Sequence, residues 1–450
     1  DTLGIHSLPG HFRKLEKELG KRMGSDLLQG ELAGVETGDI LSQDSLFREL
    51  VVQRSRAYVR KSQITAGAKE ALFPKREAPK VADYSVKRTY GKLLTMVEKA
   101  FNKTQPLFTL PMYYPLAYSK GPVADGFEDN RQKQVVGLIR ILFLKRFESS
   151  ASAFESSCQQ LLRKVMAFVQ VNSTTKHEQA ALERWRIHQE ELLGDVQKRQ
   201  HQLFDNGGED ESEQDEDVIP EEMLAAVELL DRDQFDVPQM LSESLQDLNQ
   251  LAEFLNELRQ FKPSHDDKLR ALIQLLKTDP VLKKHKVMIF SEFSATARYL
   301  ARELDNAGIK GIDQIDSATK GSRGDVIRRF APYYNNMTSQ ALADKGHKET
   351  RVLIATDVLS EGLNLQDATR LINYDLHWNP VRLMQRIGRV DRRMNPDIEK
   401  VLVKDHPEIK AIRGTVEYWN FLPPGELDEL LNLFKKVSNK TLVISQTLGI

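Results

Sequence analysis

The pattern of apolar and polar residues changes near Lys286. From there on, short apolar runs alternate with stretches of helical periodicity, and the runs are Val287–Phe290, Val352–Ala355, Leu371–Tyr374 and Val416–Phe421. Runs of this length, bounded by polar residues, are typical of strands buried on both faces. Strands that alternate with helices in this way predict a doubly wound parallel sheet, so we expect the α/β fold class for this part of the chain.

Helices are expected between these strands. The periodicity predicts helices over Ala295–Ala307, Asp325–Phe330 and Glu426–Lys436, and a short strand that ends near Ile315-Asp316. Ser264–Asp267 resembles a capping box and predicts the start of a helix over Lys268–Leu276.

The first 262 residues have mainly helical periodicity, as in 1–65 and 129–203. Val135–Phe147 is strongly apolar with three basic residues interleaved, which predicts a buried helix whose charged side chains reach out at the rim. Leucines at spacings of three and four from Leu241 to Leu258 predict packing against a neighbouring helix, with a dimeric coiled coil as the alternative. The run 205–222 is acidic and poor in apolar residues, so we expect a disordered loop there.

A helix with a basic stripe is predicted directly after the Leu371–Tyr374 strand. Asn379 is a suitable N-cap and Pro380 suits the first helical position. The polar residues of the stripe recur at i, i+3, i+4 and i+7 and continue three residues further, and they are Arg382, Gln385, Arg386, Arg389 and Arg392. A solvated basic face is the simple interpretation. The position of the stripe after two buried strands that each end in an Asp favours a functional site at the carboxyl ends of the strands.

Composition narrows the function classes. Lys and Arg total 64 and Asp and Glu 65, so a surface that binds nucleic acid has to be local. The single cysteine, Cys158, excludes a disulfide or a cysteine zinc site within these residues, and no metal site is expected. No apolar run approaches the length of a membrane span, so we expect a soluble, cytoplasmic protein.

Three blocks of sequence resemble superfamily-two helicases. Thr356-Asp-Val-Leu-Ser-Glu-Gly-Leu-Asn364 resembles motif V, Gln385-Arg-Ile-Gly-Arg-Val-Asp-Arg392 resembles motif VI, and Phe290–Phe293 resembles motif IV. The details of motifs V and VI are nearer to the bacterial branch of the Swi/Snf-like ATPases, such as the RNA-polymerase-associated helicase-like group, than to eukaryotic remodellers. The resemblance implies a RecA-like C-terminal helicase lobe at 263–450, a helical insertion at 111–262 and, from Phe73–Glu77 with the following helix, the tail end of a first lobe at 1–110.

The resemblance also implies roles for individual residues. Arg389 and Arg392 resemble arginine fingers that reach the γ-phosphate of ATP. The nucleotide side of the cleft is expected to involve Asp357, Glu361, Gly362 and Gln385. The backbone of a nucleic acid, expected to be double-stranded DNA, is to be held by Ser291, Arg323 and Thr356.

The phosphate-binding half of an ATP site is missing from these residues. No Gly-x-x-x-x-Gly-Lys-Ser/Thr occurs, and no Asp-Glu pair follows a strand, although ATP and Mg²⁺ are the cofactors that the resemblance implies. We therefore expect the C-terminal part of an ATP-dependent DNA translocase or helicase that works with an N-terminal lobe, with no activity in this segment alone. The alternatives are a non-enzymatic module that docks on DNA or protein, and a helicase subunit of a restriction or phage-defence system.

Overall fold

The computed structural model describes residues 7, 10, 73–101, 108–122, 126–196, 227–317, 319, 323–357, 364–377, 379–425 and 427. The helices expected in 1–65, the acidic run 205–222 and the helix expected over Glu426–Lys436 lie almost entirely outside these residues.

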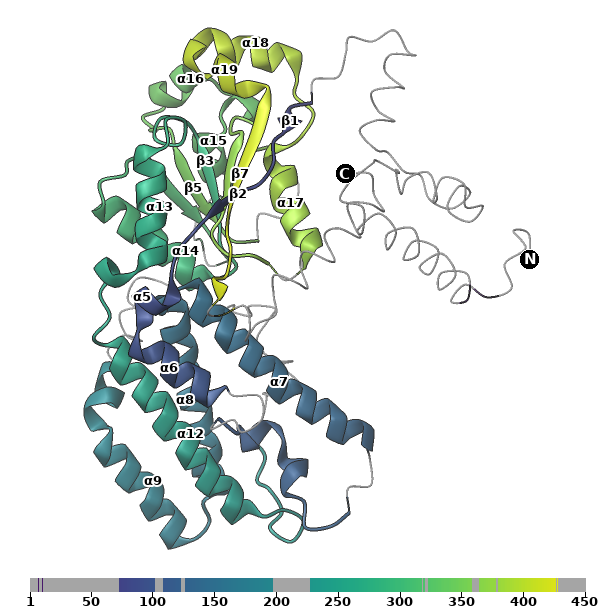
Figure 1. Cartoon of the computed structure of the whole chain (residues 1–450), viewed down its shortest axis with the longest axis vertical. Coiled ribbons are helices and arrows are strands. Elements are labelled where there is room, and N and C mark those ends of the chain that lie inside the picture. Colours follow the sequence, from purple (N-terminus) through teal and green to yellow (C-terminus); the bar gives the residue numbers. More distant parts are fainter. Residues whose placement is uncertain are drawn as a thin grey trace.

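The described residues contain a seven-stranded sheet whose strand pairs are all parallel (Figure 1). Its order is β1-β7-β6-β3-β5-β4, with β2 also paired to β7. The strands are β1 (Lys75–Arg76), β2 (Lys80–Ala82), β3 (Val287–Phe290), β4 (Ile312–Ile315), β5 (Val352–Ala355), β6 (Arg370–Asn373) and β7 (Thr415–Phe421). The expected α/β class with a parallel sheet is confirmed.

Alternation of side chains along the central strands explains why helices cover both faces. Residues such as Ile289, Ile354 and Ile372 share one apolar core with α13 (Asp267–Thr278) and α14 (Ser294–Asn306). Their neighbours, including Phe290, form a second core with α15 (Arg323–Phe330) and with Val390 of α17 (Pro380–Val390). The central strands β3, β5 and β6 are buried at every position, as a sheet covered on both sides requires.

The start of α17 follows the local sequence signals. The side chain of Asn379 accepts a hydrogen bond of 3.0 Å from the amide of Val381, and Pro380 occupies the first helical position. Asp266 plays the same part for α13, where it accepts from the amide of Leu269 at 2.9 Å. The expected N-cap at Asn379 is thus confirmed, and the signal near Ser264–Asp267 marks a real helix start.

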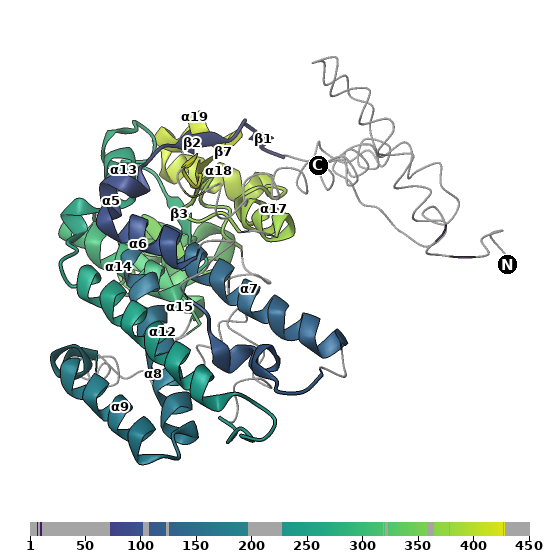
Figure 2. The ribbon, with the colours of Figure 1, turned by 60° about the horizontal axis from the view of Figure 1, so that its bottom comes forward.

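An early segment of the chain completes the sheet beside β7. Arg76 in β1 pairs with Val416, and Ala82 in β2 pairs with Phe421. Both views show β1 and β2 alongside β7 (Figures 1 and 2). Residues that the sequence placed at the end of a first lobe therefore lie in the same sheet as the strands after 286, while the division at 110 and 262 stays a prediction.

A layer of helices packs below the sheet as drawn in Figure 1. These helices are α5 (Val86–Tyr90), α6 (Lys92–Ala100), α7 (Gly126–Ser149), α8 (Ala151–Asn172), α9 (Lys176–His188) and α12 (Val237–Leu258). The leucine seam of α12 packs on α8 and α6 within the chain, and its core is continuous with that of one sheet face. The prediction that this seam packs against neighbouring helices is confirmed.

The remaining elements are short. Around the sheet lie α16 (Ser339–Asp344), α18 (Pro396–Asp405) and α19 (Lys410–Arg413). The 3₁₀ turns are η1 (Pro111–Tyr113), η2 (Pro115–Tyr118), η3 (Pro263–His265), η4 (Tyr333–Asn335) and η6 (Pro407–Ile409). No helix in the described part of the chain is long and apolar enough to cross a membrane.

A buried carboxylate in α12 makes the stability of the helical layer depend on pH. Asp247 accepts hydrogen bonds from the amides of Thr109 (2.9 Å) and Leu110 (2.7 Å). Burial raises the pKa of Asp247 to about 7, and these amides offset only part of that effect. The folded protein therefore binds this proton more tightly than the unfolded chain. The stability that Asp247 contributes is largest below its unfolded pKa of about 4 and is lost as the pH rises through about 7.

We expect Asp247→Asn to lower the Tm more at pH 5 than at pH 8, since only the wild type has to ionise this group when the pH rises. Thermal unfolding of both proteins at the two pH values measures the difference. An equal Tm difference at pH 5 and pH 8 would contradict the shifted titration.

Candidate functional site

Polar side chains gather at the carboxyl ends of three adjacent strands. Ser291 follows β3, Asp357 lies just after β5, and Asp375 lies just after β6. Because neighbouring parallel strands end at the same edge, these residues come together there, as the sequence predicted.

Asp375 is the centre of this cluster. Its Oδ2 accepts hydrogen bonds from the hydroxyls of Ser291 (2.5 Å) and Ser149 (2.9 Å) and from the amide of Glu292 (3.1 Å). Its Oδ1 accepts from Nζ of Lys268 at 3.1 Å. Burial acts to raise the pKa of Asp375, but the charge of Lys268 and these donors outweigh it and lower the pKa. The carboxylate is therefore charged and fully enclosed.

Arg386 connects α17 to two strand ends. Its guanidinium donates to both carboxylate oxygens of Asp357 at 2.6 Å and to the backbone oxygen of Asp375 at 2.8 Å. The Arg386 side chain is only 2% exposed, and it lies 5.4 Å from the ring centroid of Phe290. Burial acts to lower the pKa of Arg386, but Asp357 outweighs it and raises the pKa. A bidentate pair in this setting fixes the rotation and depth of α17.

The other side chains of the stripe differ in exposure. Gln385 is exposed, Arg382 is partly buried and Arg389 is buried. Arg392 is partly buried, and it donates to the backbone oxygen of Gly388 at 3.2 Å and to Oδ1 of Asn364 at 3.5 Å. The simple interpretation as a solvated basic face is therefore wrong for Arg386 and Arg389, while the roles assigned to Arg389, Arg392 and Gln385 stay predictions.

Asp391 ties the end of α17 to the edge strand β1. Its Oδ2 accepts from Arg76, at 2.8 Å from Nε and 2.6 Å from Nη2, and the Asp391 side chain is fully buried. The segment between Arg389 and Arg392 is thus anchored on β1, a contact that sequence reasoning missed because the partners are 315 residues apart.

The residues expected to contact nucleic acid are not equally accessible. Ser291 is fully buried and its hydroxyl is held by Asp375, so in this conformation it serves the cluster. Thr356 is buried, and its hydroxyl has no hydrogen-bond partner among the described residues. Arg323 is exposed at the start of α15 and donates to the backbone oxygen of Ser317 at 3.0 Å. Their nucleic-acid roles stay predictions.

The expected nucleotide-side residues are only partly visible. Glu361 and Gly362 lie outside the described residues. The carboxylate of Asp357 is engaged by Arg386, which also holds its pKa low against the opposing effect of burial. No group of three His, Cys, Asp or Glu side chains in the described ranges could hold a metal ion.

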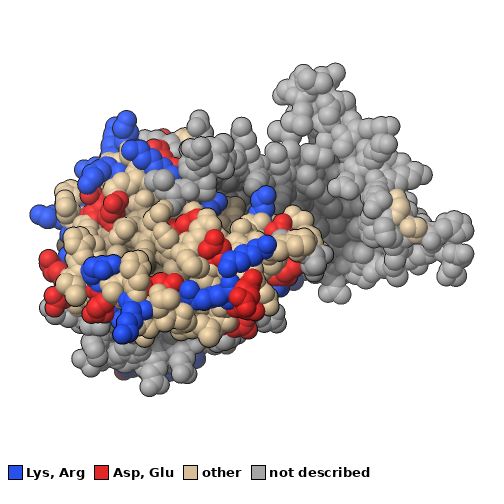
Figure 3. Space-filling model, turned by 90° about the horizontal axis from the view of Figure 1, so that it is seen from below, with Lys and Arg blue, Asp and Glu red and all other residues tan. Residues whose placement is uncertain are grey.

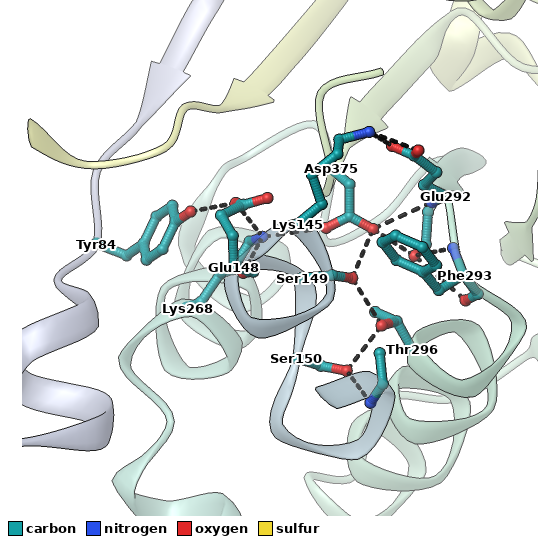
Figure 4. Close-up of polar contacts among 12 residues, drawn as sticks. Tyr84, Lys145, Glu148, Ser149, Ser150, Lys268, Glu292, Phe293, Thr296 and Asp375 are labelled. Atoms are coloured by element: carbon teal, nitrogen blue, oxygen red, sulfur yellow. Dashed lines mark hydrogen bonds and ion pairs between the residues drawn. The ribbon is translucent and has the colours of Figure 1, made fainter. Parts of the chain in front are cut away.

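Two basic residues of α7 belong to the cluster, although the sequence placed them at a solvated rim. Lys145 is buried and pairs with Glu292 (Figure 4). Arg146 is also buried, and its guanidinium lies 4.8 Å from the ring centroid of Phe293. The prediction that these two side chains reach solvent at the rim of the helix is wrong, because both charges have partners on the loop after β3. Basic residues inside a strongly apolar run were the available signal.

A cavity of about 210 Å³ lies at the other end of the strands, next to their first residues. Lys286 before β3, Arg351 before β5 and Thr369 before β6 contribute to its wall. It is therefore separate from the strand-end cluster.

The part of the chain that contains this site matches a known protein family. Residues 267–394 match the helicase conserved C-terminal domain family. The matched range includes Lys268, all strands from β3 to β6 and the whole of α17. Every site residue expected from the sequence falls inside it.

Curated relatives match the same part of the chain. An uncharacterized ATP-dependent helicase, YqhH of Bacillus subtilis, is 37% identical over 107 residues, which is 24% of this chain and 16% of the relative. The putative ATP-dependent DNA helicase fml2 of Schizosaccharomyces pombe is 28% identical over 34% of this chain and 19% of its own length. The RNA polymerase-associated protein RapA of Sodalis glossinidius is 29% identical over 26% of this chain and 11% of its own length.

The match thus spans less than a fifth of each of these relatives. A solved structure of the C-terminal part of the Fun30 ATPase domain is similar over 80% of this chain and 89% of that chain, with 14% identity and a TM-score of 0.34. Residues 267–394 thus contain a module of the helicase C-terminal type, built on the parallel sheet described above.

Proposed function

We propose that this chain is the C-terminal part of an ATP-dependent DNA translocase or helicase of the bacterial Swi/Snf-like group. In this proposal Arg389 of α17 and Arg392, two residues after the end of that helix, reach the γ-phosphate of an ATP molecule that a first lobe binds. ATP and Mg²⁺ would be held mainly by that lobe, because these 450 residues lack the phosphate loop. The expected cytoplasmic location is part of the same proposal.

The observation that carries the proposal is the fixed orientation of α17. Arg386 is bonded to the ends of β5 and β6, and Asp391 is bonded to Arg76 of β1. Both ends of the segment that contains Arg389 are thus held against the sheet. Charge stabilisation in phosphoryl transfer depends on guanidinium groups that are already in place and lose no proton, and such anchoring provides the first of these conditions.

Double-stranded DNA is the proposed partner, contacted through the strand-end loops. Tracking along nucleic acid needs hydroxyls and amides that contact the backbone, since sequence readout would stop movement. The exposed Arg323 has the required chemistry. Thr356 also has it, because its hydroxyl, although buried in this conformation, has no hydrogen-bond partner among the described residues.

The alternative of a docking module predicts a basic surface on the helical layer. In Figure 3, which shows the molecule from the side of that layer, Lys and Arg alternate with Asp and Glu on the described part of this face. This distribution does not favour a docking module that binds DNA through this face. A helicase subunit of a restriction or phage-defence system uses the same site and would differ in the domains that accompany it.

The test is ATP hydrolysis by the full-length protein with duplex DNA, single-stranded DNA and RNA of equal length. We expect duplex DNA to raise the turnover by about 10-fold or more, since completing a phosphoryl-transfer site is worth at least that much. Binding of duplex DNA without any hydrolysis would instead establish the docking module. Stimulation by RNA alone would overturn the choice of DNA.

A further inference from the structure

The corner between α7 and α8 is inserted between the strand-end loops (Figure 4). Three side chains of the last turns of α7 each contact a different part of these loops. Lys145 pairs with Glu292, Arg146 lies over Phe293, and the hydroxyl of Ser149 donates to Asp375 at 2.9 Å. The helical layer therefore contacts the same loops that carry the proposed site.

Hydroxyl groups continue this contact into α14. Thr296 lies 2.7 Å from the hydroxyl of Ser149 and 2.7 Å from that of Ser150. Ser150 also caps α8 by accepting from the amide of Ala153 at 3.1 Å. The corner is thus held by directional bonds as well as by apolar packing, and directional bonds define position more narrowly.

The charges in this junction are almost completely buried. The side chains of Lys145 and Glu292 are each 2% exposed. Lys268 is 4% exposed and bonds to Glu148 of α7 at 2.7 Å and to Asp375 at 3.1 Å. Buried charges are tolerated only with partners in good geometry, so the corner has one well-defined position against the loops.

Asp375 links this corner to α17. Its carboxylate receives Ser149 from α7, and its backbone oxygen receives Arg386 from α17. Asp375 is therefore the one residue that contacts both Ser149 of α7 and Arg386 of α17, the helix that carries Arg389 and ends two residues before Arg392. The path is short and consists of observed contacts.

We propose that the α7–α8 corner regulates the position of α17. Ser149 is a positioning residue that acts on α17 through Asp375, and in this way the helical layer controls turnover. This inference rests on the proposed function for its effect on ATP hydrolysis. Its structural part, the coupling of the corner to α17, does not depend on that function.

The test compares Ser149→Ala with Ser157→Ala in the full-length protein. Ser157 is a matched control, because it is also buried in α8 and donates only within its helix, to the backbone oxygen of Ala153 at 3.1 Å. We expect Ser149→Ala to lower the DNA-stimulated kcat by about fivefold or more with an unchanged KM for ATP, as coupling between sites commonly does. Ser157→Ala should leave both constants within about twofold of the wild type.

Hydrogen exchange of residues 380–390 provides the readout that is independent of activity. Ser149→Ala should speed exchange in this segment by about fivefold, the effect of one lost hydrogen bond, and Ser157→Ala should not. Thr296→Val, which removes the hydroxyl between Ser149 and Ser150 and keeps the shape, should shift exchange in the same direction. If Ser149→Ala fails to fold, Thr296→Val provides the comparison.

Equal exchange in the Ser149 and Ser157 variants would overturn the inference, whatever the ATPase result. Absence of DNA-stimulated hydrolysis in the wild type, with faster exchange of residues 380–390 in Ser149→Ala, would overturn the proposed function and leave the coupling supported.

Discussion

Replacement of Arg389 or Arg392 by alanine in the full-length protein is expected to lower DNA-stimulated ATP hydrolysis by about 10³-fold. A guanidinium that reaches the γ-phosphate stabilises the charge that spreads over its oxygens in the transition state, and alanine leaves that charge without a partner. DNA binding should stay within about twofold, because the proposed DNA contacts lie on the strand-end loops. Steady-state hydrolysis and a DNA-binding titration, at one fixed salt concentration, measure the two effects.

Arg393→Ala is the control for this experiment. Arg393 is the exposed neighbour of Arg392, so its removal changes the charge of the same segment by the same amount. We expect hydrolysis within about twofold of the wild type for a surface change of this kind. Wild-type turnover in both the Arg389 and Arg392 variants would remove the arginine fingers from the proposal.

The second large effect is expected from Lys268→Met, which should lower the free energy of unfolding by about 3–5 kcal/mol. Lys268 bonds to Glu148 and Asp375, and its ammonium lies 4.5 Å from the ring centroid of Tyr374. Methionine keeps most of the volume but leaves two buried carboxylates without their cation. Urea unfolding of both proteins, followed by circular dichroism, measures the loss.

The loss should be smaller at pH 5 than at pH 8. In the wild type, Lys268 helps to lower the pKa of Asp375 against the effect of burial, so the stability from Asp375 is present above its unfolded pKa and falls as acid is added. Burial already raises the pKa of Glu148 in the wild type, although Lys268 opposes it. Without Lys268, the pKa of both carboxyls rises from its wild-type value, and the folded variant gains stability when they are protonated. An equal loss at both pH values would show that the carboxylates are not the cause.

Lys92→Met is the matched control for Lys268→Met. Lys92 pairs with Glu257 at 3.0 Å, but its side chain is 74% exposed. A surface pair of this kind contributes about 1 kcal/mol or less, so this substitution should hardly change unfolding. A loss as large as that of Lys268→Met would mean that the method is not measuring buried charge.

The local parts of the fold could be predicted from the sequence. Val287–Phe290 and Val352–Ala355 have the expected bounds, because a strand buried on both faces appears as an uninterrupted apolar run. Asn379 was recognised as a cap because capping depends on neighbouring residues only. The pairing of β1 and β2 with β7 could not be predicted, since it joins segments at opposite ends of the described chain.

The sequence predicted where the candidate site lies, but not which side chains contact one another in it. The strand-end Asp residues and the stripe of α17 were visible in the sequence, but the choice of partner was not. Arg386 rather than Arg382 pairs with Asp357, and Lys145 points to Glu292 rather than to water. Such choices depend on which helix face meets the sheet, and this is decided by packing between segments that are distant in sequence.

The position of β7 in the sheet sets an order for folding during synthesis. Lys75 pairs with Thr415, so β1 leaves the ribosome well before β7 and stays without this partner strand until β7 has been made. Contacts that close so long a loop form slowly, which leaves Lys75–Ala82 and the free edge of β6 open to other partners in the meantime. A nascent chain halted before Thr415 would thus present two unpaired strand edges, each able to pair with a strand of another chain.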